Sequence, residues 1–323
     1  LLAEEPPVQI PCTSSSKQTV ALSVAAALLC CAMAPTLVAQ SPLQEPVVAR
    51  VEMKLAIGEE LVDTIAQGDL LTVLEEREDD YVILTHDGSK GAIDKVNAVK
   101  IAESGDIYSE LILKHPDEGR YYTLRAAAWW ALGKAEEALA DFDKAIELGY
   151  TEAHAYTSRG LFHAEMGNFE HAIADYDEAL RINPKDVSPV INRAAVHMSQ
   201  GQPMKAVQDY TLALKVERDS TSLLRQRAIA LKAAGKLDEA AADFDSILEQ
   251  HPDDYAAVMG RGYVHFQKLD YEKAIEDFAK AIELDPKDAV AFNNRGYNRY
   301  QLGEYAGALE DYDEALRLAP KYG

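Results

Sequence analysis

Cysteine is scarce in this chain, and it lies at one end. Among 323 residues there are three cysteines, Cys12, Cys30 and Cys31. A disulfide framework or a Cys-ligated zinc site needs cysteines distributed through the folded part of a chain. Neither can therefore organise the residues that follow Cys31.

Positive charge is also in short supply. The sequence has 32 Lys and Arg against 54 Asp and Glu, which gives a formal net charge of −22. A surface this acidic repels phosphate backbones and anionic lipid headgroups instead of releasing their counterions. We therefore expect no nucleic-acid partner and no electrostatic docking on membranes.

Charge of either sign is missing from one N-terminal stretch. No charged side chain occurs between Gln18 and Gln44, and the apolar run from Thr19 to Ala34 follows the lone cation Lys17. This layout is typical of a secretory signal, with small residues before Gln40 as a cleavage site. We expect a targeting segment over 1–39 and a periplasmic or secreted protein. The alternative is an uncleaved anchor, because residues 19–38 are long enough to span a bilayer.

Short β-branched runs separated by turn signals follow this segment. Residues 50–101 include Leu70–Leu74 after a Gly-Asp turn and Tyr81–Thr85 before Asp87-Gly88, a strong hairpin signal. The order of these pieces resembles the bacterial Src-homology-3-like β-barrel. The resemblance implies ligand-binding aromatics at the places that Asp80 and Ala92 occupy. Since those aromatics are missing, we interpret the barrel as a structural spacer.

The rest of the chain repeats one unit every 34 residues, six times from residue 119. Glycine recurs at the end of the first half of the unit, with Leu269 as the one exception. Alanine and an aromatic residue mark the second half, and proline ends four of the six units. The recurring residues are Gly133, Gly167, Gly201, Gly235 and Gly303, then Ala138, Ala172, Ala206, Ala240, Ala274 and Ala308. Small residues on one face let two antiparallel helices approach closely, and proline stops the second helix.

These repeats resemble the tetratricopeptide repeat family over 119–323. The resemblance implies a mainly α fold, an α-solenoid of six helix pairs, with the small all-β barrel before it. It also implies a concave face that binds protein or peptide segments. The family's concave positions predict a peptide-binding groove that contains Trp130, Met259, Tyr263, Phe266, Asn293, Asn294, Tyr297 and Tyr300. Aromatic and amide groups suit an extended peptide, although the same aromatics could simply pack the first helices together.

An Arg stands at the seventh position of every repeat, and an Asp follows it sixteen residues later. The arginines are Arg125, Arg159, Arg193, Arg227, Arg261 and Arg295, and the acids are Asp141, Asp175, Asp209, Asp243, Asp277 and Asp311. Antiparallel helices bring such positions into range, either within a repeat or across to the next. We interpret them as a structural ion-pair ladder, and the alternative is a row of Arg for an anionic ligand.

The two ends of the repeat array differ. The register extends upstream over 106–117, where Tyr108, Leu111 and Pro116 predict a lone N-capping helix. No comparable cover follows the last helix, so we expect either further residues after Gly323 or a second chain on that face, which allows an oligomer.

Motifs of catalysis are absent: there is no Gly-rich phosphate loop, no His-Glu-x-x-His and no nucleophile elbow. His163, His197 and His265 share the eleventh repeat position. Neighbouring repeats place such positions about 10 Å apart, whereas zinc holds its ligands at about 2 Å. We therefore expect structural histidines, no metal, no cofactor and no enzyme.

The sequence thus predicts a non-catalytic envelope scaffold that binds protein or peptide partners on its repeats. The alternative is an envelope-attachment protein, whose β-barrel binds cell-wall material while the repeats oligomerise.

Overall fold

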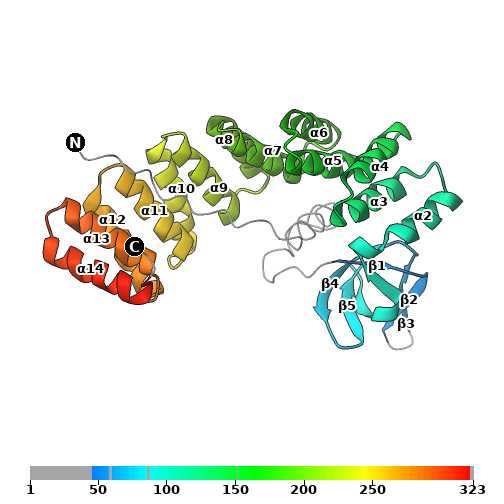
Figure 1. Cartoon of the computed structure of the whole chain (residues 1–323), viewed down its shortest axis with the longest axis horizontal. Helices are drawn as coiled ribbons and strands as arrows, with labels where there is room; N and C mark the ends of the chain where they lie inside the picture. The colour runs from blue at the N-terminus through cyan, green and yellow to red at the C-terminus, as the bar shows by residue number, and fades with distance from the viewer. Residues whose placement is uncertain (1–45, 58–59, 86–87, 151, 321–323) are drawn as a thin grey trace. The chain divides into compact units, whose positions relative to one another are not determined.

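The computed structural model describes residues 46–57, 60–85, 88–150 and 152–320. The chain divides into two compact units, Leu1–Pro184 and Lys185–Gly323. The first contains a β module and the first helices, and the second contains the remaining helices (Figure 1). The expected targeting segment, 1–39, and the alternative anchor, 19–38, lie outside the described residues. Within those residues, no helix combines the length and the apolar content needed to cross a membrane.

The described residues of the β module form seven short strands. They are β1 Val47–Ala49, β2 Met53–Ile57, β3 Glu60–Ile65, β4 Leu70–Glu76, β5 Asp80–Leu84, β6 Lys90–Asp94 and β7 Ala98–Lys100. Five form an antiparallel sheet in the order β6-β5-β4-β1-β7, and β2 pairs with β3. The module begins with β1, three residues before the expected start at 50. Its core contains Val47, Leu71 and Ile83, each almost fully buried.

Helix α2, Gly105–Lys114, joins the β module to the first repeat. The Tyr108 hydroxyl donates to the Gly68 carbonyl oxygen at 3.1 Å, and Tyr108 shares one apolar cluster with Val48 and Leu124. A Cβ at Gly68, where φ is +87°, would lie 2.6 Å from Leu111 Cδ1. Glycine is required there because the chain turns through a left-handed conformation under the helix.

Six antiparallel helix pairs follow α2. The first unit holds α3 Gly119–Ala131, α4 Ala135–Glu147, α5 Ala153–Glu165 and α6 Phe169–Ile182. The second holds α7 Val187–Ser199, α8 Pro203–Val216, α9 Thr221–Ala233, α10 Leu237–Gln250, α11 Tyr255–Gln267, α12 Tyr271–Leu284, α13 Ala289–Gln301 and α14 Tyr305–Leu318. Within each unit, the second helix of one pair packs against the first helix of the next.

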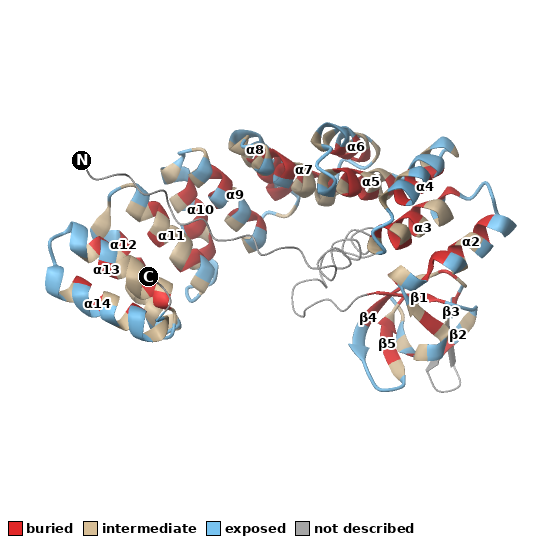
Figure 2. Cartoon of the chain, viewed as in Figure 1, coloured by how far each residue is buried: buried red, intermediate tan, exposed pale blue. Residues whose placement is uncertain are grey.

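The close helix packing follows from the repeated small and aromatic residues. Ala138, Ala172, Ala240 and Ala274 are completely buried on the second helices, and the aromatic residue four positions later is buried in the same pairs. Figure 2 shows the buried residues gathered along the facing sides of the helices in each unit. The described part of the chain is therefore a mainly helical tetratricopeptide-like solenoid after a small β-rich region.

The turn within each pair needs a left-handed residue. Glycine supplies it in five repeats, and Leu269 adopts φ 64° at the same place in the fifth repeat. The Leu269 amide still donates to the Phe266 carbonyl oxygen, at 2.9 Å, as Gly133 does to Trp130 at 2.8 Å. The hydrogen-bond pattern of the turn thus overrides the cost of a side chain in this conformation, about 1–2 kcal/mol.

Candidate functional site

Each repeat contains a buried Arg–Asp pair that joins its two helices. Within the first unit, Arg125 Nε and Nη2 donate to the two Asp141 carboxylate oxygens at 2.7 Å each, and Arg159 binds Asp175 in the same forked way. The other pairs are Arg193–Asp209, Arg227–Asp243, Arg261–Asp277 and Arg295–Asp311. The aspartates are 2–6% exposed. The pairing occurs within a repeat, because the antiparallel helices bring the seventh position opposite the acid.

Several of these arginines also reach back to the preceding second helix. Arg159 Nη1 donates to Asp143 and Arg261 Nη1 donates to Asp245, both at 2.7 Å. Arg227 Nη1 donates to the Thr211 hydroxyl at 3.3 Å. One guanidinium therefore fixes the two helices of its own repeat and the stacking of that repeat on the one before.

The ion pairs keep the arginines charged. The Asp141 carboxylate raises the pKa of Arg125, and the Asp243 carboxylate raises the pKa of Arg227, in each case against the opposing effect of burial. Because their donors are committed to neighbouring carboxylates, these arginines are poorly suited to hold an external anion.

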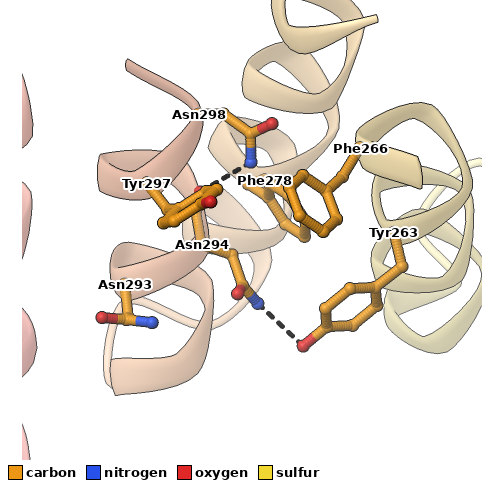
Figure 3. A pocket seen from close by; sticks show the side chains of 7 residues that line it. All are labelled: Tyr263, Phe266, Phe278, Asn293, Asn294, Tyr297 and Asn298. Atoms are coloured by element: carbon orange, nitrogen blue, oxygen red, sulfur yellow. Dashed lines mark hydrogen bonds between the residues drawn. The ribbon is translucent and has the colours of Figure 1, made fainter. Parts of the chain in front are cut away.

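Five of the eight predicted groove residues lie together in the second unit. Tyr263 and Phe266 of α11 and Asn293, Asn294 and Tyr297 of α13 line a cavity of about 180 Å³, with the Asn294 side chain pointing toward Tyr263 (Figure 3). The Asn294 carboxamide nitrogen donates to the Tyr263 hydroxyl oxygen at 2.7 Å. We call this cavity the α11–α13 pocket.

Aromatic edges form the apolar walls of the α11–α13 pocket. The Phe266 and Tyr297 rings meet edge to face with centroids 5.5 Å apart, and Tyr263 meets Phe278 of α12 at the same separation. Tyr297 is 43% exposed, whereas Phe278 is 1% exposed. An engineered apolar cavity of about 150 Å³ holds a benzene molecule, so this pocket has room for about one aromatic or aliphatic side chain.

Trp130 was expected in the groove, and this expectation is wrong. Its side chain is 3% exposed in the first unit, where it packs edge to face on Phe162 at 5.7 Å. Its indole nitrogen donates to a Glu165 carboxylate oxygen at 3.0 Å. Large neighbours close over Trp130, so it contributes to the core and offers no surface to a ligand.

The two remaining predicted residues do not line the α11–α13 pocket. Met259 packs against the buried Val258, Ala281 and Ala291. Tyr300 is 53% exposed and contacts Tyr305 of α14, with ring centroids 5.5 Å apart.

Asn298 lines the α11–α13 pocket and was missed at the sequence level. It is 1% exposed, its amide nitrogen donates to the Asn294 carbonyl oxygen at 2.8 Å, and its Oδ1 accepts no hydrogen bond. At this tenth position every other repeat has a buried apolar residue, namely Ala128, Phe162, Val196, Ala230 and Val264. A polar residue at a position that is apolar in the other five repeats is the sequence signal that could have identified Asn298.

The three histidines at the eleventh position lie beside the ladder. His197 Nε2 is 3.9 Å from Asp209 Oδ2, and His265 Nε2 is 3.9 Å from Asp277 Oδ2. Burial lowers the pKa of His163 and of His265. Among the described residues, no three His, Cys, Asp or Glu side chains are grouped as a metal site would require.

Antiparallel helix pairs that stack on one another within each unit define a helical-repeat protein. Two tetratricopeptide repeat models match the chain, one over residues 92–151 and 225–289 and the other over 153–186 and 289–322. Together they cover more than half of the sequence, and residues 187–224, with α7 and α8, fall outside them. The chain belongs to the tetratricopeptide repeat family.

Solved structures give the same fold. The chain is similar to YrrB, described as a tetratricopeptide repeat protein with an unusual peptide-binding site, at 27% identity and a TM-score of 0.50; the match covers 59% of this chain and 96% of YrrB. It is also similar to the C-terminal part of a repeat protein from Cytophaga hutchinsonii, at 18% identity and a TM-score of 0.62, over 68% of this chain and 91% of the other. No curated protein matches the sequence.

Proposed function

We propose that this protein is a non-catalytic scaffold that binds an extended protein or peptide segment at the α11–α13 pocket. The observation that carries the proposal is the pocket itself. Its aromatic edges enclose room for one side chain, and the Asn293 and Asn294 carboxamides stand beside that room. An extended peptide offers both a side chain for the cavity and backbone groups for the amides.

The similarity to YrrB supports the same class of function. YrrB is described as having a peptide-binding site, and its identity to this chain is 27%. The α11–α13 pocket is formed by first helices of adjacent repeats, which form the concave face in the family that the sequence resembles. Concave-face binding is therefore our assignment for this chain.

A peptide library displayed on phage tests the function. Selected peptides are titrated by fluorescence anisotropy against the full chain and against Asn294→Ala. Loss of the amide should weaken binding about tenfold, the effect of about one good hydrogen bond.

Asn192→Ala is the matched control for this test. Asn192 is the same residue at the same repeat position, on α7. Its removal should leave binding unchanged. Selection of no peptide, or equal loss in both variants, contradicts the proposal.

We also propose that the protein is exported to the cell envelope. The support is the uncharged, Ala-rich run after Lys17 and the small residues before Gln40. In cell fractionation, the full chain should accompany envelope or secreted proteins, and N-terminal sequencing should start at Gln40. Val24→Arg combined with Leu28→Arg should retain the chain in the cytoplasm, and unchanged export of this variant contradicts the proposal.

We propose a structural role for the β module, whose sequence resembles a Src-homology-3-like barrel. Val48 and Ile101 share an apolar cluster with Tyr108 of α2 and Leu124 of α3. Such a contact covers the end of a helical-repeat array, which otherwise exposes apolar surface. Val48→Asp should therefore expose α2 and α3 to proteolysis. Unchanged proteolysis would contradict this role.

A further inference from the structure

Lys232 of α9 has no acidic partner in the described part of the chain. Other cations of the same helix are engaged: Arg225 binds Asp254 at 2.6 Å and Arg227 binds Asp243 at 2.6 Å. The chain as a whole carries a net charge of −22, so carboxylates are abundant. Other cations of the second unit that have no acidic partner among the described residues, such as Lys205 and Lys273, are exposed, whereas Lys232 is half-buried.

The surroundings of Lys232 disfavour its charge. The side chain is half-buried, and burial lowers the pKa of the ammonium, with no neighbouring carboxylate to raise it. The contact that remains is with the face of Tyr263, whose ring centroid lies 5.5 Å from Lys232 Nζ. A cation–π contact of this kind compensates only part of the lost hydration, so an arriving anion would gain from pairing here.

Tyr263 connects Lys232 to the α11–α13 pocket. Its ring lies under the ammonium, its hydroxyl accepts from Asn294, and the side chain lines the cavity. A cation and an apolar cavity thus lie on two sides of one aromatic residue. In an extended strand, side chains two residues apart lie on the same side, about 6.6–7 Å from each other. One extended ligand can therefore present one side chain to the ammonium and a second to the cavity.

We propose that the ligand of the α11–α13 pocket carries an Asp or Glu side chain that pairs with Lys232, two residues from an apolar side chain seated in the pocket. This inference rests on the proposed peptide-binding function and specifies its ligand. Lys232 then acts as a selectivity residue, because a neutral side chain at the same place leaves its ammonium half-buried and unpaired.

Two pairs of blocked pentapeptides test the inference. One pair is acetyl-Ala-Phe-Ala-Asp-Ala-amide and its Asn counterpart, and the other has the Phe and the acidic or amide residue exchanged. Blocking both ends leaves the side chain as the only anion. In NMR titrations of the full chain, at least one Asp peptide should bind about fivefold more tightly than its Asn counterpart, a ratio typical of a partly exposed ion pair.

Lys232→Met keeps the aliphatic stem and should abolish the preference for Asp, with an unchanged melting curve. Lys236→Met is the matched control, because Lys236 is exposed and lies 3.8 Å from Glu239. It removes the same charge and should retain the fivefold ratio. The ratio should also shrink as salt is added.

The possible failures are distinguishable. Equal binding of Asp and Asn peptides to the full chain overturns acid recognition and leaves the pocket function standing. A requirement for a free C-terminal carboxylate also overturns the proposal, because the anion would then come from a chain end. No binding by any of the peptides, together with no peptide selected by phage display, overturns the pocket function as well.

Discussion

The same slot between successive first helices is filled in one unit and open in the other. Between α3 and α5, Trp130 and Phe162 meet edge to face and are 3% and 2% exposed. Between α11 and α13, the equivalent residues are Phe266 and Asn298, and a cavity of about 180 Å³ remains. The backbone pattern is common to both, so the bulk of two side chains decides whether the slot is core or pocket.

This difference separates residues that hold the fold from residues that can bind. A buried indole side chain is stabilised by van der Waals contacts with its neighbours, and it presents no accessible surface to a ligand. The smaller Phe266 and the amide of Asn298 leave polar and aromatic groups facing a space. Variants at equivalent positions should therefore affect stability in the first unit and binding in the second.

The largest effect is expected at Trp130. Trp130→Ala should lower the free energy of unfolding by about 3–5 kcal/mol, because it leaves a large cavity in the first unit. Phe266→Ala, at the equivalent position, should cost about 1–2 kcal/mol because its side chain already borders open space. Urea unfolding followed by far-UV circular dichroism measures both. Equal losses would show that the two slots are packed alike.

The next largest effect concerns the ladder that both units share. Arg227→Ala leaves the buried Asp243 carboxylate without its partner and should cost about 3–5 kcal/mol. Peptide affinity should be unchanged under conditions where the variant is folded. Weaker binding with an unchanged melting curve would instead make the arginines ligand-binding residues.

A smaller effect of opposite sign is expected at Asn298. Asn298→Val introduces the residue that the fifth repeat has at this position, Val264, and removes a buried acceptor without a hydrogen bond. The free energy of unfolding should rise by about 1 kcal/mol, since an unsatisfied buried polar group costs about 1–3 kcal/mol. Thermal and urea unfolding measure the change. The reverse control, Val264→Asn, should destabilise, and a loss of stability in Asn298→Val would contradict the prediction.

The smallest effect should be the same in both units. Burial lowers the pKa of His163, in the first unit, and of His265, in the second, below 6.5. As pH falls, the unfolded chain takes up these protons before the native state does. Their contribution to stability is therefore complete above about pH 6.5 and is lost below it.

Urea midpoints at about pH 7.5 and about pH 5.5 test this dependence. His163→Gln and His265→Gln should each lose less stability on acidification than the unmodified chain does. The loss of stability measured for the unmodified chain is subtracted from the loss measured for each variant. This subtraction cancels the contribution of the carboxylates, which both proteins share. An unchanged or larger loss in the variants would show that the histidines do not contribute.

The repeat period made much of this fold predictable. Glycines, alanines and aromatics at fixed intervals predicted six helix pairs, because close helix packing demands small residues at the same place in every copy. The recurrence of Arg and of an Asp sixteen residues later belongs to the same regularity, which left open whether each Arg pairs within its repeat or across to the next. Asn298 could have been found in the same way, as a polar residue where the other repeats are apolar.

The candidate site was less predictable. The repeat register places a residue on a helix face, but it does not determine whether the surrounding side chains fill the space beside that residue. Trp130, Met259 and Tyr300 were assigned to the groove by register alone, and none of them lines the pocket. Lys232 was not singled out because its lack of an acidic partner depends on where every nearby carboxylate lies.

The sequence by itself determined the helix pairs and their boundaries near each turn, since these depend on a short-range periodicity that is repeated in every unit. It placed the Arg and Asp residues of the ladder, and the tertiary structure decided that each pair forms within its own repeat. Only the tertiary structure decided that α2 packs against the β module, that the slot beside Trp130 is closed and that the slot beside Phe266 is open. Those outcomes depend on how side chains that are far apart in the sequence pack together and how much space they fill. A local sequence pattern does not contain that information.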